Sequence, residues 1–299
     1  MLPPGLESRA PTTLRVDMSG TVGDYVQSVL TGAYIVGATE IELNFRSKIG
    51  LTERERISDW IRRLPGYEIL DEDSRRILIS DTSEKQMILP ILKRQFSTTK
   101  FMLGTLVHAM QDGRTEDADR INARDEDVDR HRYFVERMCH IALRDPAYAR
   151  KVQITSSDCL HFSMAAKKVE RIADHICGAA ADFVEQKVVD RAVSRFAEEV
   201  ADVYDDTMQA FFAVEPSKVG IENNVSGDEA AFAVVQGASK LAERIAKQEV
   251  SPRVSNPGLA LLLMHLERIS SYSADTCEIA INRMVSNRID SVHAVTDSL

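Results

Sequence analysis

Two pairs of acidic residues with the same spacing are the side chains most able to do chemistry in this sequence. Glu170 and Asp174 lie four residues apart in the stretch KKVERIADHICGAA, and Asp125 and Asp129 repeat that spacing in RDEDVDR. Residues four apart share one face of a helix, where two like charges cost roughly 0.2–0.5 kcal/mol. Each pair is therefore unfavourable for a helix unless a positive charge compensates it.

A metal ion would supply that compensation. If the two helices that carry the pairs pack antiparallel, all four carboxylates converge on one face. Oxygen-only ligands suit hard cations such as Mg²⁺, Mn²⁺, Ca²⁺ or iron, and a bound cation would make the repulsive cluster stabilising. The pattern predicts the metal ligands Asp125, Asp129, Glu170 and Asp174, with a divalent ion (Mg, Mn, Fe or Zn) as the one cofactor.

A second interpretation of the same acids stays open. Residues 116–129 contain seven acidic residues, and a run of charge usually forms a solvated face. In that case the basic residues nearby would form ordinary surface ion pairs with the acids, and these are Arg120, Arg124, Lys167 and Arg171.

The histidines are interpreted as structural. His175 follows the second acidic pair, but it points about 100° away from Asp174 around a helix. We interpret five further histidines as scattered and without partners, namely His108, His131, His140, His161 and His265. No Glu has a His three residues later, as a di-iron carboxylate bundle requires, and no phosphate-binding glycine loop or nucleophile–His arrangement occurs. We therefore expect no enzyme and no catalytic residues.

Composition and charge describe an ordinary globular chain of 299 residues, with 44% hydrophobic and 28% charged residues. A net charge of −9 argues against nucleic-acid binding, which normally needs a basic surface. The start MLPPGLESRAP lacks a signal-peptide pattern, and GLALLLMHL is far shorter than a membrane span. The four cysteines form no CxxC pair. We expect a cytoplasmic protein with reduced thiols and no membrane insertion.

Residues 1–82 predict a small α/β module. TLRVDM and TEIELNF resemble short strands with an amphipathic helix between them. A second helix covers LTERERISDWIRRLPG, where Thr52 and Glu55 have the spacing of a capping box. YEIL and RRILIS flank a turn and predict a hairpin. The order is therefore strand, helix, strand, helix, hairpin.

Residues 83–299 predict a helical domain. We expect a first bundle at 83–187 and a second at 188–290, each of three helices, so the fold class is mainly α. The segments VERIADH (169–175) and LERISSY (266–272) are 97 residues apart and indicate a duplication. The helices are expected at 83–110, 115–143, 155–185, 189–212, 228–248 and 256–284, with a frayed tail DSVHAVTDSL.

VERIADH resembles the signature of the PhoU phosphate-uptake regulators, and RDEDVDR resembles the acidic segment in the second helix of their bundle. The leading module resembles the α/β segment before the PhoU domain in archaeal members. Those relatives often begin with an AbrB-like hairpin element that binds DNA. This chain starts about where that element would end, so we expect the element to be missing.

The resemblance implies a regulator without catalytic chemistry, which restrains phosphate import and phosphate-starvation signalling. The implied partners are components of a phosphate ABC transporter or a signalling protein, together with a second copy in a homodimer. It also implies metal binding through acidic motifs with the i, i+4 spacing. Two alternatives stay open: a transcription-linked regulator whose α/β module dimerises or contacts DNA, and a metal-sensing bundle unrelated to phosphate.

Overall fold

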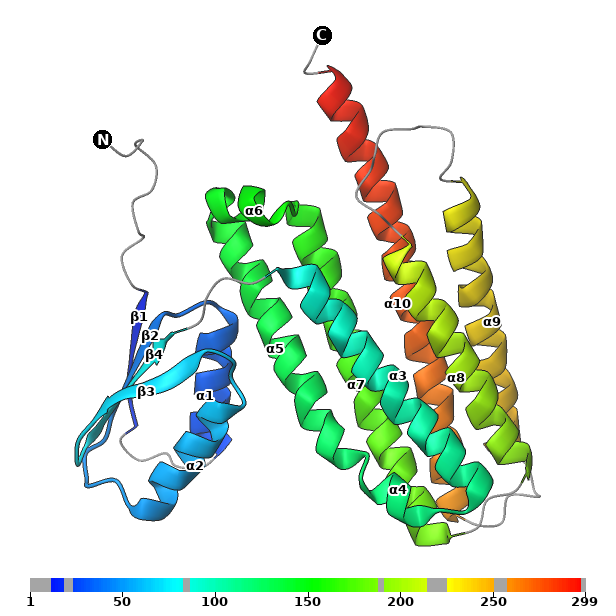
Figure 1. Cartoon of the computed structure of the whole chain (residues 1–299), viewed down its shortest axis with the longest axis horizontal. Helices are drawn as coiled ribbons and strands as arrows, with labels where there is room; N and C mark the ends of the chain where they lie inside the picture. The colour runs from blue at the N-terminus through cyan, green and yellow to red at the C-terminus, as the bar shows by residue number, and fades with distance from the viewer. Residues whose placement is uncertain are drawn as a thin grey trace. The chain divides into compact units, whose positions relative to one another are not determined.

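The structure is a computed structural model of the whole chain (Figure 1). The residues it describes are 12–18, 24–82, 87–187, 191–213, 225–249 and 257–296.

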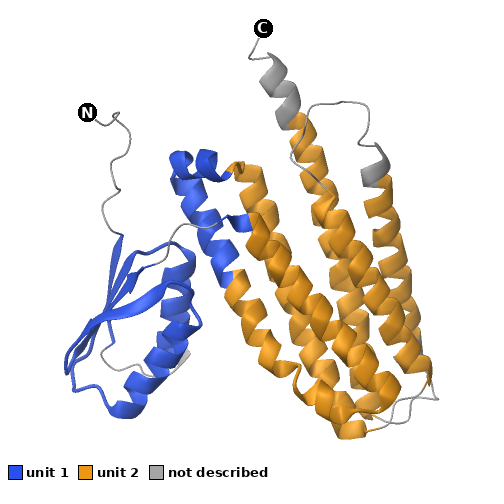
Figure 2. Cartoon of the chain, in the orientation of Figure 1, with its two compact units in different colours: residues 1–88, 133–152 blue, residues 89–132, 153–299 orange. Residues whose placement is uncertain are grey.

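The chain divides into two compact units (Figure 2). Unit 1 comprises residues 1–88 and 133–152, and unit 2 comprises residues 89–132 and 153–299. Helix α5 (Asn122–Arg144) thus contributes its first part to unit 2 and its second part to unit 1. Independent folding of two domains that meet at residues 82 and 83 stays a prediction.

Unit 1 contains the predicted α/β module. Its order of strands and helices is the one expected, and the sheet has the strand order β1-β2-β4-β3. Strands β1 and β2 pair in parallel, whereas β2–β4 and β3–β4 are antiparallel. The bounds are β1 Thr13–Asp17, α1 Asp24–Ile35, β2 Glu40–Asn44, α2 Leu51–Arg62, β3 Tyr67–Glu72 and β4 Arg76–Asp81.

The core of the module lies between the sheet and its two helices, which cover one face (Figure 1). Alternate residues of a strand point to opposite faces, and Ile41, Leu43, Ile77 and Ile79 are all fully buried. Ile41 pairs with Ile79 across the β2–β4 ladder. Because buried apolar residues occupy every second position in the two central strands, the sequence alone predicts them.

The capping box expected at the start of α2 is wrong. The helix begins two residues earlier than that box would place it, with Gly50 instead of Thr52 as N-cap and no hydrogen bond from a capping side chain. The carbonyl of Gly50 accepts the first helical bond, from the backbone N–H of Arg54, so Thr52 lies inside the first turn and cannot cap it. A true capping box occurs at α7 (Ser156–Gln186), where Thr155 and Asp158 each accept a backbone N–H of the other.

Arg137 joins the second part of α5 to the module within unit 1. Its side chain is fully buried. It donates to the carbonyls of Tyr34 at 2.6 Å and Ala38 at 2.9 Å, and it forms an ion pair with Asp81. The guanidinium also lies 5.1 Å from the ring centre of Tyr67. A buried charge persists only where such partners replace water, so this arginine ties the helix to the sheet.

Unit 2 is helical, and six long helices agree with the expected segments in the described part of the chain. The mainly α fold class with a leading α/β module is therefore confirmed. The long helices are α3 Ile88–Asp112, α5, α7, α8 Arg191–Phe212, α9 Val225–Glu249 and α10 Pro257–Thr296.

Three details differ from the expected helices. The second one is broken into α4 (Thr115–Asp119) and α5, because the chain turns at Arg120 to bury both Ala118 and Ile121. A further helix, α6 (Pro146–Val152), follows where a stop was expected, since the Asp145 carboxylate accepts two backbone N–H groups of its first turn. The tail expected to fray is helical to Thr296, and no Gly or Pro interrupts it after Met284.

The two halves of the helical region pack through α7 and α10, which run side by side. Helix α10 also packs against α8 and α9. Buried side chains join the remaining helices: Gln95 of α3 donates to the carbonyl of Ala166 in α7, and Tyr204 of α8 donates to that of Phe96 in α3. No helix in the described ranges is both long enough and apolar enough to cross a bilayer.

Candidate metal site

The four predicted ligands meet on neighbouring helices of unit 2. Asp125 and Asp129 lie on α5, and Glu170 and Asp174 lie on α7. Asp125 is close enough to the other three that each of their charges raises its pKa. Arg132 spans the two helices, 3.9 Å from Asp129 and 3.5 Å from Glu170. We call Asp125, Asp129, Glu170 and Asp174 the carboxylate cluster.

The carboxylate cluster has a buried floor and an open rim. Glu170 is only 7% exposed, because its helix face packs in the bundle. The side chains of Asp129 and Asp174 are 34% and 42% exposed. One carboxylate is thus removed from water, while the others stay within reach of a solute.

Crowding and burial make these carboxylates reluctant to ionise. Burial, followed by the charge of Asp129, raises the pKa of Asp125 to about 6. Burial also raises the pKa of Asp129 to about 6, although Arg132 opposes the shift. The pKa of Asp174 is raised by burial and then by Glu170. Shifts of this kind in a cluster are typical of functional sites as well as of structural ion-pair networks.

Basic residues compensate the cluster in part. Lys167 lies 3.4 Å from Glu170, and Arg171 lies 3.3 Å from Asp174 and 3.7 Å from Glu170. Arg124, by contrast, pairs at 3.2 Å with Asp127, which is outside the cluster. The second interpretation of the acids as an ion-paired surface therefore keeps support at the rim.

The buried floor is not fully compensated. Oε2 of Glu170 is inaccessible to water and accepts no hydrogen bond from the described residues. A buried carboxylate oxygen without a donor is costly, and it is the kind of atom that binds a cation.

Sequence reasoning missed two members of this surrounding. Arg132 is 9% exposed and contacts both helices; its position three residues after Asp129 was the available signal. Cys177 donates to Asp125, and burial followed by the charge of Asp125 raises the pKa of its thiol to about 12. It lies one turn after Asp174, a spacing that places it on the same side of α7.

The donor set fits a hard divalent cation in type and charge, because it consists of carboxylate oxygens. One of them, Oε2 of Glu170, is buried and accepts no hydrogen bond among the described residues, with Nε of Arg171 3.7 Å away. As the side chains stand, the described part of the chain holds no group of three or more His, Cys, Asp or Glu residues arranged to hold a metal ion.

The corresponding segment of the second half is arranged differently. Ser271 takes the place of Asp174 in the repeat, and its hydroxyl donates to Glu267 at 2.8 Å. Arg268 also lies 3.4 Å from Glu267. Asp275, one turn further, pairs with Lys168 at 2.6 Å. Glu267 therefore has two partners and Asp275 has one, all within hydrogen-bonding or ion-pair distance.

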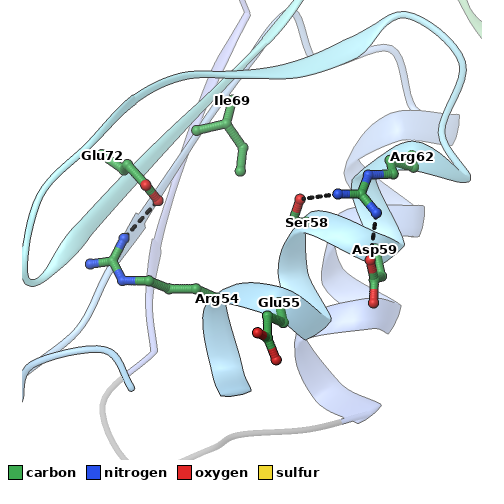
Figure 3. A pocket seen from close by; sticks show the side chains of 7 residues that line it. All are labelled: Arg54, Glu55, Ser58, Asp59, Arg62, Ile69 and Glu72. Atoms are coloured by element: carbon green, nitrogen blue, oxygen red, sulfur yellow. Dashed lines mark hydrogen bonds and ion pairs between the residues drawn. The ribbon is translucent and has the colours of Figure 1, made fainter. Parts of the chain in front are cut away.

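A groove of about 430 Å³ lies elsewhere, in unit 1 between α2 and β3 (Figure 3). Arg54 pairs with Glu72 at 2.6 Å and Arg62 with Asp59 at 2.8 Å. Both arginines are thus neutralised by carboxylates of the groove itself, which leaves no charge concentrated for a ligand. Its lining residues are Arg54, Glu55, Ser58, Asp59, Arg62, Ile69 and Glu72.

The interpretation of His265 as a residue without partners is wrong. Its Nδ1 lies 2.8 Å from Nδ1 of His175, and its Nε2 lies 3.6 Å from Asp182. The two histidines are 90 residues apart in sequence, and only the packing of α10 against α7 brings them together.

Comparisons with known proteins give a family match over the part of the chain that contains the carboxylate cluster. Residues 92–182 match the model of the PhoU domain family. A comparison with curated proteins gave no significant match. Among solved structures, the phosphate transport system regulatory protein PhoU from Streptococcus pneumoniae is similar, with 17% identity and a TM-score of 0.47, over 65% of this chain and 91% of that one. This structural likeness is too weak to support a conclusion about function.

Proposed function

We propose that this protein regulates phosphate uptake and phosphate homeostasis by binding other proteins. The observation that carries the proposal is the match of residues 92–182 to the PhoU domain family. That segment contains the whole carboxylate cluster and the helices that position it. The proposal assigns no catalytic step to the protein.

The carboxylate cluster is the proposed sensing or structural site within this function. Asp125, Asp129, Glu170 and Asp174 would hold a divalent cation, with Glu170 as the buried ligand. A bound cation would supply the positive charge that offsets their mutual repulsion. Arg132 would keep α5 and α7 aligned beside it, since it lies within ion-pair distance of both helices.

The proposed partners are components of a phosphate transporter or a signalling protein, and the proposed assembly is a homodimer. The test is affinity purification of the tagged full-length chain from phosphate-replete and phosphate-starved cells. Transporter or phosphate-signalling subunits should co-purify, in amounts that change with phosphate supply. Their absence under both conditions, or recovery of transcription machinery in their place, would contradict the proposal and favour the transcription-linked alternative.

Metal binding is tested separately by elemental analysis after exposure of chelator-treated protein to Mn²⁺ or Fe²⁺. The double variant Asp129→Asn, Asp174→Asn should lose the bound metal. Glu267→Gln is the matched control, because Glu267 corresponds to Glu170 in the repeat and already accepts a hydrogen bond from Ser271. Retention of metal in the double variant, or equal loss in the control, would remove the carboxylate cluster as the site.

A further inference from the structure

A second group of metal-ligating side chains lies between α7 and α10, on a different face of α7 from the carboxylate cluster. His175, Gly178 and Asp182 follow one another along α7 at spacings of three and four residues, so they share a face. His265 of α10 lies against this face, with the centre of its ring 5.1 Å from that of His175. We call His175 and His265 the histidine pair, and Asp182 is the carboxylate beside it.

The ring of His265 packs directly against Gly178. A Cβ atom at position 178 would lie 2.3 Å from Cε1 and 2.5 Å from Nε2 of His265. Both distances are far below any van der Waals contact, and the obstacle is a ring that is held between two helices. The absence of a side chain at this position therefore lets His265 approach α7 closely enough to meet His175.

The two facing nitrogens have the separation of two ligands of one metal ion. Zinc–nitrogen bonds of about 2.0–2.1 Å place two ligand nitrogens about 2.9 to 3.3 Å apart, depending on the coordination angle. Nδ1 of His175 and Nδ1 of His265 are 2.8 Å apart. An outward movement of a few tenths of an ångström would open the pair around an ion.

Both side chains are at a depth that suits a metal site. Each is partly buried, with part of its surface accessible to solvent, so an ion in solution can reach both rings.

Asp182 completes the arrangement on the other side of His265. Its Oδ2 is 3.6 Å from Nε2 of His265. That oxygen is buried and accepts no hydrogen bond within the described residues. Histidines that ligate a metal commonly donate their other nitrogen to a carboxylate, which fixes the ring orientation and the tautomer. Asp182 is therefore a positioning residue that would leave Nδ1 of His265 free for the ion.

We propose that His175 and His265 form a transition-metal site that bridges the two halves of the helical region, with water in the remaining coordination positions. Two imidazole nitrogens favour Zn²⁺, Ni²⁺ or Cu²⁺ over Mg²⁺, Ca²⁺ or Mn²⁺, so its selectivity differs from that of the carboxylate cluster. Occupancy would cross-link α7 to α10. The inference is independent of the proposed function.

The experiment uses chelator-treated full-length protein that carries Asp125→Asn and Asp129→Asn, so that the carboxylate cluster is weakened at positions distant in sequence from the histidines. Cu²⁺ is added and followed by electron paramagnetic resonance, and Zn²⁺ and Ni²⁺ by calorimetry. We expect one ion per chain, with nitrogen couplings in the copper spectrum. His175→Gln and His265→Gln should each weaken binding by at least about tenfold.

Control variants separate this site from other sources of binding. His108→Gln removes an exposed histidine of α3 and should leave affinity unchanged. Gly178→Ala should weaken binding by about tenfold, because the methyl group displaces His265. Circular dichroism confirms that each variant is folded. If the His175→Gln and His265→Gln variants bind copper as tightly as the protein with both histidines, the binding is adventitious surface binding and the proposal is overturned. A copper spectrum without nitrogen couplings would also overturn it.

Discussion

Helix α5 contributes to two groups of buried charge, which are compensated to different degrees. Arg137 is fully buried and is met by Asp81 and by the carbonyls of Tyr34 and Ala38. In the carboxylate cluster, Glu170 is almost as buried, yet its Oε2 accepts no hydrogen bond among the described residues. Nε of Arg137 is likewise without a hydrogen bond among those residues, but both terminal nitrogens of its guanidinium have oxygen partners. Glu170 instead lies among further carboxylates, and a cation would supply the charge that they lack.

The difference shows how a structural charge can be told from a functional one. A structural buried charge is surrounded by groups that replace its lost water. A cluster of like charges with raised pKa values holds unfavourable electrostatic energy, and a ligand of opposite charge can release that energy.

Replacement of Arg137 should cause the largest loss of stability. Arg137→Met removes the guanidinium that pairs with Asp81 and donates to two carbonyls, and breaking a buried pair in this way costs about 3–5 kcal/mol. Trp60, the one tryptophan of the chain, lies in the same unit, so its fluorescence in a urea titration measures the change. Arg150→Met removes an exposed arginine of unit 1 and is the control. Equal midpoints for the two variants would show that Arg137 is not a structural anchor.

The carboxylate cluster, unlike Arg137, should destabilise the metal-free protein, and this destabilisation should increase with pH. The pKa values of Asp125 and Asp129 rise from 3.8 to about 6 on folding. The folded state therefore holds more protons between about pH 4 and pH 6, and its stability falls as the pH rises through that window. Relative to the variant Asp125→Asn, Asp129→Asn, the wild-type protein should lose about 2 kcal/mol after allowance for solvent screening.

Chemical denaturation at a series of pH values, with chelator present, measures that difference. The reference is the double variant at the same pH, so that changes elsewhere in the protein cancel. Parallel profiles for the two proteins would mean that the carboxylates are no more strained than exposed ones.

A single neutral substitution in the cluster should stabilise the metal-free protein. Asp125→Asn keeps the shape of the side chain but removes a charge that Asp129, Asp174 and Glu170 oppose. We expect a gain of about 1–2 kcal/mol at about pH 7.5. The matched control on the same helix is Asp127→Asn, which removes an acid paired with Arg124 and should bring no gain. Thermal unfolding with and without Mn²⁺ distinguishes them, and a loss of stability in metal-free Asp125→Asn would contradict the comparison.

Removal of a cation at the rim of the cluster should have the smallest effect. Lys167 contacts Glu170 at 3.4 Å, but its own side chain is 42% exposed. Exposed partners of this kind contribute about 0.5 kcal/mol or less. Lys167→Met should therefore move the unfolding midpoint only slightly, while Arg132→Met, at a nearly buried position, should move it further. A larger loss from the lysine variant would place the compensation at the rim.

Several elements of the fold follow from local patterns that the sequence displays directly. Alternation of apolar residues in β2 and β4 predicted the two central strands, and helical periodicity predicted the six long helices. The exceptions are at element ends. Thr52 had the spacing of a capping residue, but Gly50 begins the helix. Helix α5 ends at Arg144, before Pro146, as expected, but Asp145 caps a further short helix that was not expected. Such ends depend on which backbone groups the surrounding chain leaves without partners.

The predicted site was accessible from sequence for a similar reason. The i, i+4 spacing placed each acidic pair on one helix face, and antiparallel packing of two helices was the one further assumption. The identity of the bound metal, and its presence, stay predictions. The compensating residue Arg132 was not found, because an arginine near an acidic run has many possible partners until the facing helix is known.

Local patterns in the sequence were enough to predict the mainly helical class, the leading α/β module and the two acidic pairs, since each depends on the periodicity or spacing of residues close together along the chain. Tertiary structure alone decided that Arg137 would be buried against carbonyls about 100 residues away, that Oε2 of Glu170 would accept no hydrogen bond among the described residues, and that His175 would meet His265. Those outcomes depend on packing between distant segments. Their free energies come from the replacement of water around buried polar atoms, and spacing along one chain carries no information about which atoms will do so.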